Sequence, residues 1–160
     1  MPAETRAPPV GAPLIRRAGP DDLAAVRAIV REAYAKYVSR IGREPGPMRS
    51  DYAALLARGA IHVAERDGVV LGLVVLLAEP DAMLLDNVAV APEAQGSGLG
   101  RMLLDFAEGE ARRRGRECIR LYTHATMTEN IALYQARGYA ETHRATEDGL
   151  LRVFMAKRLD

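Results

Sequence analysis

The spacing of hydrophobic residues along this chain changes repeatedly between the period of a strand and the period of a helix. Apolar runs rich in β-branched residues, bounded by Gly, Pro or Asp, predict strands at 14–18, 61–66, 69–77, 82–90, 118–123, 139–145 and 151–157. Apolar residues that recur every three or four positions predict helices at 21–38, 51–57, 99–114 and 130–137. The order β-α-α-β-β-β-α-β-α-β-β predicts an α/β (α+β) fold, a mixed sheet of six to seven strands flanked by about four helices.

The first residues of the chain lack any such period. They are rich in proline and contain no apolar core of the kind that a signal peptide needs. We therefore expect a flexible N-terminal tail over 1–12 and a single domain over 13–160.

Composition narrows the class of protein. A length of 160 residues with 49% hydrophobic residues suits one globular domain with a real core. The net charge of +1 gives no overall field to attract nucleic acid, and no apolar run is long enough to span a membrane, so neither partner is expected. The single cysteine, Cys118, excludes an intrachain disulfide and fits a cytoplasmic location. The His, Cys and carboxylate residues show no metal-ligand spacing, so no metal site is predicted.

One glycine-rich segment joins a predicted strand to a predicted helix. It runs from Gln95 to Arg101, reads Q-G-S-G-L-G-R, and follows an apolar run that ends at Pro92. Its glycines carry no Cβ, so the backbone can approach a ligand closely. The N–H groups and the dipole of the following helix favour an anion. The segment predicts a phosphate-binding loop, although a turn that merely joins strand and helix is the simpler alternative.

Two common phosphate motifs do not fit this loop. The dinucleotide motif G-x-G-x-x-G requires a last glycine where the chain has Arg101 or Leu103. The Walker motif requires Gly-Lys-Ser/Thr, which the chain lacks. A nucleotide-binding domain of either kind is therefore disfavoured.

A second motif lies on the predicted helix 130–137. Asn130 and Tyr134 are four residues apart, so their side chains share one helix face and can address the same ligand. Gly138 ends the helix and Tyr139 follows it. Taken alone, Tyr134 is better explained as a half-buried helix residue whose hydroxyl reaches water.

Together the two motifs resemble the GNAT superfamily of N-acetyltransferases. Gln95, Gly98 and Gly100 match the Q/R-x-x-G-x-G/A loop with which that family binds acyl-coenzyme A. The Asn, internal Tyr, Gly and final aromatic residue of a second family motif are matched by Asn130, Tyr134, Gly138 and Tyr139. The resemblance covers 14–159, is strongest over 85–139, and implies a sheet splayed between the strands at 82–90 and 118–123.

The resemblance implies acetyl-coenzyme A as the co-substrate, with no metal. Its pantetheine arm is expected in the splay, and its pyrophosphate on the N–H groups of the glycine loop. Asn130 is expected to meet the arm, and Tyr134 the thioester sulfur. The implied coenzyme contacts are Val88, Ala89, Val90, Gln95, Gly96, Ser97, Gly98, Leu99, Gly100, Arg101, Asn130 and Tyr134.

The implied reaction is direct transfer of an acetyl group to a primary amine of a small molecule or a protein. Tyr134 would donate a proton or a hydrogen bond to the departing thiolate. The general base stays open between Asp86, which lies two residues before Val88 on the same strand face, and His124, whose reference pKa is near neutral. Asp86 is equally explained as a hydrogen-bond partner of a neighbouring loop, and His124 as a surface residue.

The acceptor amine is not identified by the sequence. The resemblance places it between the first two helices and the last hairpin, which makes Tyr34, Tyr37 and Met48 candidate contacts, although the tyrosines also have the spacing of packing residues. A homodimer is compatible with the resemblance. The alternative function is a non-catalytic acyl-coenzyme A binding or regulatory module of the same fold, against which the polar pair Asn130 and Tyr134 argues.

Overall fold

The computed structural model describes residues 12–160. The tail expected over 1–12 lies outside the described residues, apart from Ala12.

The strands form one seven-stranded sheet in the order β1-β2-β3-β4-β5-β7-β6, so the last hairpin inserts β7 beside β5. All neighbouring pairs are antiparallel except β4 and β5. This confirms the predicted mixed sheet. The strands are β1 (Leu14–Arg17), β2 (Ile61–Arg66), β3 (Val69–Ala78), β4 (Met83–Val90), β5 (Cys118–His124), β6 (Ala140–Glu147) and β7 (Leu150–Arg158).

The helices match the predicted order as well. Their bounds are α1 (Leu23–Ile41), α2 (Tyr52–Ala57), α3 (Leu99–Arg113) and α4 (Thr128–Ala136). The first helix extends beyond its predicted end at 38 and is capped by Gly42, whose φ is 84°. A short 3₁₀ helix, Gly46–Arg49, lies between α1 and α2. The last helix begins at Thr128, two residues before its predicted start, and Met127 is its N-cap.

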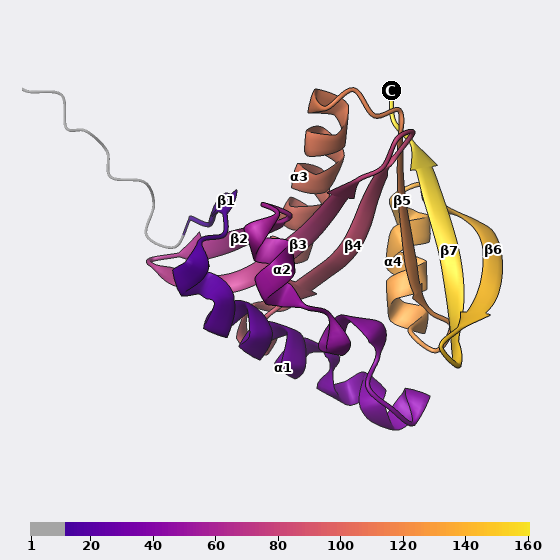
Figure 1. Cartoon of the computed structure of the whole chain (residues 1–160), viewed down its shortest axis with the longest axis horizontal. Helices are drawn as coiled ribbons and strands as arrows, with labels where there is room; N and C mark the ends of the chain where they lie inside the picture. The colour runs from indigo at the N-terminus through magenta and orange to yellow at the C-terminus, as the bar shows by residue number, and fades with distance from the viewer. Residues whose placement is uncertain (1–11) are drawn as a thin grey trace, which may run out of the picture.

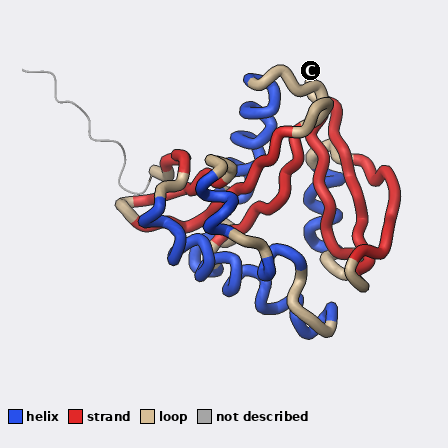
Figure 2. Tube along the Cα trace, in the orientation of Figure 1, coloured by secondary structure: helices blue, strands red, loops and turns tan. Residues whose placement is uncertain are grey.

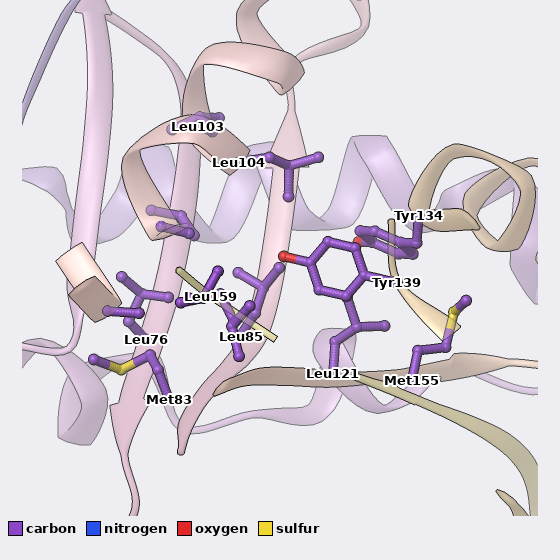
Figure 3. Close-up of a cluster of buried hydrophobic side chains, with 14 of the residues drawn as sticks. Leu76, Met83, Leu85, Leu103, Leu104, Leu121, Tyr134, Tyr139, Met155 and Leu159 are labelled. Carbon is purple, nitrogen blue, oxygen red and sulfur yellow. The ribbon is translucent and has the colours of Figure 1, made fainter. Parts of the chain in front are cut away.

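The helices cover the sheet on two faces (Figures 1 and 2). Residues of α1 and α2 pack with β2, β3 and β4 in one hydrophobic cluster, and residues of α3 and α4 pack with β4, β5 and β7 in the other. Figure 3 shows part of the second cluster, where the rings of Tyr134 and Tyr139 lie 5.6 Å apart and edge to face. Tyr134 thus belongs to the core as well as to the helix face predicted to meet a ligand.

The sheet parts between its two central strands. β4 and β5 pair only at Met83 with Ile119, at Leu84 with Arg120 and at Leu85 with Leu121. Beyond these residues the two strands diverge, as Figure 1 shows. The predicted splay is confirmed.

A β-bulge in β4 begins where the pairing with β5 ends. Val75 of β3 pairs with Asn87, and the next residue, Leu76, pairs with Leu85, so Asp86 is the extra residue of the bulge. Asp86 therefore has no partner in β3.

The bulge reverses the alternation of side chains along β4. Leu85 belongs to the cluster beneath α3, and Val88 packs against the same cluster although it is three residues further on. Asn87 and Ala89 turn to the side of α1. The expectation that Asp86 and Val88 share a strand face is therefore wrong, because it assumed a regular strand.

A buried carboxylate ties α3 to the end of α4 and to β7. Glu108 accepts hydrogen bonds from Lys157 Nζ (2.6 Å), Arg137 Nη2 (2.9 Å) and the Tyr139 hydroxyl (3.3 Å). Burial alone would raise the pKa of Glu108, but the hydrogen bonds from Lys157 and Arg137 hold it below the ordinary value. Asp105 pairs with the same Arg137 at 2.7 Å, yet its side chain is 66% exposed.

Replacing Glu108 with Gln should destabilise the fold by about 2–3 kcal/mol, because it leaves Arg137 and Lys157 without their buried partner. The matched change Asp105→Asn should cost less than about 1 kcal/mol, since exposed ion pairs contribute little. A carboxyl with a lowered folded-state pKa stabilises above its unfolded pKa and loses that contribution as the pH falls through its folded pKa. Denaturant unfolding should therefore show the parent losing its advantage over Glu108→Gln below about pH 4.5. Equal stabilities at pH 7 would contradict this account.

Candidate active site

The first hollow beside the splay is a groove that runs along β4 to the glycine loop. Residues of α1, β4, the loop, α3 and α4 line it, and we call it the loop groove. Its lining residues are Ala33, Tyr34, Lys36, Tyr37, Val88, Ala89, Val90, Gln95, Gly96, Gly100, Leu104, Asn130, Leu133 and Tyr134.

The glycine loop has the backbone that its sequence predicts. Gly96 and Gly98 have φ angles of 81° and 89°, in the left-handed region that favours glycine, and a Cβ on either would meet nothing within 4 Å. Gly98 is the N-cap of α3, and the first intrahelical bond runs from Met102 N–H to Gly98 O at 3.1 Å. The N–H groups of 99–101 precede that bond, so they remain available to an anion.

Two other residues of the loop hold it in place. The Gln95 side chain donates from Nε2 to Val90 O at 3.1 Å, and the Ser97 hydroxyl donates to Ala94 O at 2.5 Å. Both side chains therefore bond to the protein's own main chain. Of the loop residues, Gln95, Gly96 and Gly100 line the groove.

The backbone of β4 presents polar groups to the splay. Ala91 N–H donates to Leu71 O at 2.8 Å, so the odd-numbered residues of this stretch bond toward β3. By alternation, the N–H and C=O groups of Val88 and Val90 point away from β3, where β5 no longer pairs with β4. These groups lie where the predicted coenzyme arm requires hydrogen-bond partners.

A second hollow lies on the far side of Tyr134, and we call it the inner cavity. Its lining comes from β4, β5, α4, β7 and the segment after α1. The lining residues are Tyr34, Pro45, Gly46, Pro47, Leu85, Asp86, Asn87, Val88, Leu121, Tyr122, Thr123, His124, Met127, Asn130, Tyr134, Leu150 and Arg152. The residues that line both hollows are Tyr34, Val88, Asn130 and Tyr134, so the two meet at the splay.

Tyr134 stands at this junction with only 7% of its surface exposed. Burial, together with the nearby Tyr37, raises the pKa of Tyr134 well above its usual range. The phenol therefore keeps its proton at neutral pH and can donate a hydrogen bond or a proton. Asn130, one helical turn earlier, lines the same two hollows.

Asp86, the bulge residue, faces the inner cavity. The Tyr122 hydroxyl donates to its Oδ1 at 3.2 Å. Burial raises the pKa of Asp86, although the hydrogen bond from Tyr122 and the charge of Arg152 oppose the rise. A carboxylate with a raised pKa beside a cavity is a candidate general base.

His124 also lines the inner cavity, but its ring is already engaged. The Thr126 N–H donates to its Nδ1 at 3.1 Å, so the neutral ring carries its proton on Nε2. Burial and the charge of Arg152 lower the pKa of His124. In this arrangement the free ring nitrogen is a donor, which leaves Asp86 as the better-placed acceptor of a proton.

Asn87 carries a hydrogen-bond network that the sequence did not reveal. Its Oδ1 accepts from the Tyr34 hydroxyl at 2.6 Å, and its Nδ2 donates to the Tyr52 hydroxyl at 2.9 Å. Tyr34 also lies 3.2 Å from Val88 O, and Tyr52 donates to Pro47 O at 2.5 Å. The network ties α1, α2 and the segment after α1 to the bulge. The available signal was a lone amide within an apolar strand.

The three predicted acceptor contacts lie in different places. Tyr34 lines both hollows, and Tyr37 lines only the loop groove. Met48 lines neither of them but a separate surface pocket next to Tyr52. The residues that reach the inner cavity from this segment are Pro45, Gly46 and Pro47. Tyr122 and Arg152, which were not predicted from the sequence, also line the inner cavity.

No group of three or more His, Cys, Asp or Glu side chains within residues 12–160 is arranged to hold a metal ion. Over the same residues, no helix has the length and apolar character needed to cross a membrane.

A sheet that parts beside a glycine loop at a helix start is the arrangement implied by the resemblance to N-acetyltransferases. The family model described as "Acetyltransferase (GNAT) family" matches residues 24–139. The chain therefore belongs to the GNAT family of acetyltransferases, which confirms the predicted family.

Among the curated relatives that match parts of the chain are two acetyltransferases. The mycothiol acetyltransferase of Cellulomonas flavigena is 35% identical over 91 residues, which are 50% of this chain and 26% of that protein. The [ribosomal protein bS18]-alanine N-acetyltransferase of Salmonella typhimurium is 41% identical over 61 residues, 38% of this chain and 41% of that protein. The matches thus span less than half the length of either relative.

The fold also matches a solved structure of a coenzyme complex. The PaiA N-acetyltransferase of Thermoplasma acidophilum, in complex with coenzyme A, aligns with a TM-score of 0.77 and 19% identity. The alignment covers 92% of this chain and 99% of that one. The likeness confirms the predicted fold.

Proposed function

We propose that this chain is an acetyl-coenzyme A-dependent N-acetyltransferase that passes the acetyl group directly to a primary amine. The observation that carries the proposal is the meeting of the two hollows at Tyr134. One of them runs to the glycine loop, and the other contains Asp86. The acetyltransferase names of both curated relatives support the same class of reaction.

The residues of the loop groove fit acetyl-coenzyme A, which supplies the thioester. The N–H groups at 99–101 suit its pyrophosphate, because they start a helix and lack intrahelical acceptors. Gly96 and Gly98 leave the space beside the loop open. The N–H groups of Val88 and Val90 suit the amide-bearing arm, and Asn130 adds a side-chain amide at the junction.

Three groups of this chain serve the transfer. Asp86 takes a proton from the attacking amine, directly or through water, so that the nitrogen lone pair can form the new C–N bond. The Val88 N–H stabilises the negative charge on the carbonyl oxygen. The nitrogen of the adduct releases its remaining extra proton to water. As the C–S bond breaks, the sulfur takes a proton from Tyr134, which regains one from water, so the products are the amide and the free thiol.

The need for a base depends on the acceptor. An amine with a pKa of about 10.4 is neutral only about 0.04% of the time at pH 7, which costs about 4.6 kcal/mol. An α-amine with a pKa of about 7.7 loses only about 1 kcal/mol. Asp86 is therefore most useful for strongly basic amines.

Thiol release from acetyl-coenzyme A across a panel of primary amines tests the proposal. We expect amine-dependent release above the background of hydrolysis. Tight coenzyme binding in a thermal-shift assay, without release for any amine, would instead support a non-catalytic binding module.

Replacing Gly100 with Val should weaken coenzyme binding while the fold persists. A Cβ at Gly100 meets only Val90 Cγ2, at 3.8 Å, so the branched side chain fits the protein but enters the groove. We expect the dissociation constant to rise roughly tenfold or more, because each hydrogen bond to a charged group is worth about 1.5–3 kcal/mol. Gly109→Val, on the exposed side of the same helix, is the matched control. Unchanged coenzyme affinity in a folded Gly100→Val protein would overturn the placement of the coenzyme.

Replacing Tyr134 with Phe should lower turnover about 100-fold, because only the donor to the thiolate is lost. Coenzyme affinity should change little. Tyr139→Phe is the matched control, since the Tyr139 hydroxyl bonds to Glu108 in the core and lies away from both hollows. Equal turnover for Tyr134→Phe and the parent would show that the phenol only packs.

Replacing Asp86 with Asn should lower kcat/KM most at neutral pH, with partial recovery as the pH rises. The recovery follows from the neutral fraction of the amine, which grows tenfold for each pH unit below the amine's pKa. His124→Ala should keep the shape of the parent profile, because His124 offers a donor to the cavity. A changed profile for His124→Ala and a parental one for Asp86→Asn would transfer the role of base to His124.

A further inference from the structure

A third hollow adjoins the inner cavity, and arginines dominate its lining. It is formed by Arg43, Gly46, Arg49, Asp148, Leu150 and Arg152, and we call it the arginine pocket. Gly46, Leu150 and Arg152 also line the inner cavity, so the two hollows are contiguous. Arg49 and Asp148 are exposed, so the arginine pocket lies at the surface.

Contacts between arginine side chains and the main chain connect the two segments that form this pocket. Arg43, just after α1, donates from Nη1 to Asp148 O at 2.6 Å, which joins the segment after α1 to the turn between β6 and β7. A Cβ on Gly46 would come within 3.3 Å of Arg152 Nη2, so the guanidinium lies against the Gly46 backbone. The pocket is therefore bounded by main chain as well as by side chains.

Positive charge exceeds negative charge in the arginine pocket. Arg152 pairs with Glu147 at 2.6 Å. Within residues 12–160, no carboxylate lies within ion-pair distance of Arg43 or Arg49. The Asp148 carboxylate lines the pocket without such a pair. Three guanidinium groups thus face two carboxylates, and two of the guanidinium groups are not neutralised by a contact.

One tyrosine connects these cations to the candidate base. The guanidinium of Arg152 lies 4.7 Å from the centre of the Tyr122 ring, and the hydroxyl of that ring donates to Asp86 at 3.2 Å. Asp86 therefore lies at the hydroxyl end of Tyr122, and Arg152 lies over the ring of the same side chain. A molecule whose amine reaches Asp86 can place a second group among the arginines if only a few bonds separate the two.

We propose that the acceptor is a small primary amine that also carries a carboxylate or phosphate group. Its amine lies at Asp86, and its anionic group lies in the arginine pocket. A guanidinium binds both anions through paired N–H donors. Arg43 uses Nη1 for the main-chain oxygen of Asp148, but among the described residues neither Arg43 nor Arg49 pairs with a carboxylate, so both can contribute donors to an anion. This inference rests on the proposed function, because it assigns the acceptor of the same site.

Matched acceptors test the proposal by thiol release. γ-Aminobutyrate is compared with butylamine, and phosphoethanolamine with ethanolamine, so that each pair differs in the anionic group. We expect kcat/KM to be at least about tenfold higher for the member of each pair that carries the carboxylate or phosphate. This is the effect of one hydrogen bond between charged groups. A preference for only one of the two anions identifies which of them the pocket takes.

Variants locate the effect. Arg49→Gln should raise KM about tenfold for the amines that carry a carboxylate or phosphate, with little change in kcat and none in the KM of butylamine or ethanolamine. Arg43→Gln should act in the same direction, and the exposed Arg49 provides the variant that leaves the fold untouched. Arg112→Gln removes the same charge from the exposed end of α3 and controls for net charge.

The role of the arginine pocket and acetyl transfer itself can be tested separately. Equal kcat/KM for amines with and without the carboxylate or phosphate group, unaffected by Arg49→Gln, would overturn the arginine pocket and leave acetyl transfer intact. If no amine supports thiol release, calorimetric titration of γ-aminobutyrate and butylamine with coenzyme A present decides the matter. Tighter binding of γ-aminobutyrate than of butylamine, lost in Arg49→Gln, supports the proposed role of the arginine pocket. Equal binding of the two compounds, or no binding, overturns it.

Discussion

The parting of β4 from β5 is the constraint on which the site depends. Two adjacent parallel strands normally satisfy each other's backbone groups, and here they do so only as far as Leu85 and Leu121. Beyond that point the N–H groups of Val88 and Val90 have no strand partner on the side of β5, and the two carbonyl oxygens accept from the side chains of Tyr34 and Gln95. Because unpaired backbone groups are costly when buried, the opening suits a ligand that carries its own amides. The hollows on either side of Tyr134 follow from the same separation.

The bulge in β4 adds a second condition. An extra residue at Asp86 turns its carboxylate to the inner cavity and lets Asn87 face α1, where it bonds to Tyr34 and Tyr52. A regular strand would place only one of these two polar side chains on that side. The buried amide then holds two helices against the strand that carries the candidate base. The residue that anchors the two helices, Asn87, is therefore the direct neighbour of the candidate base, Asp86.

Charge is distributed unevenly across the molecule despite a net charge of +1. Glu108 neutralises Arg137 and Lys157 in the core between α3, α4 and β7. The arginine pocket, in contrast, contains Arg43 and Arg49 without carboxylate partners among the described residues. The first arrangement stabilises the fold, because each buried charge has an opposite charge beside it. The second arrangement leaves guanidinium groups next to the inner cavity that can bind an anion.

The sequence by itself determined the order of helices and strands and the glycine loop, because these depend on local periods and on glycine's freedom at 96 and 98. The splay was implied only by the resemblance of the two motifs to the GNAT family. Only the tertiary structure decided the face of Asp86, since one extra residue reverses the alternation along β4 without any local signal. The same holds for Met48, which the fold places outside the inner cavity, and for Tyr122 and Arg152, which β5 and β7 bring to Asp86 by strand pairing. Contacts between residues far apart in sequence have no signature in the spacing of either segment.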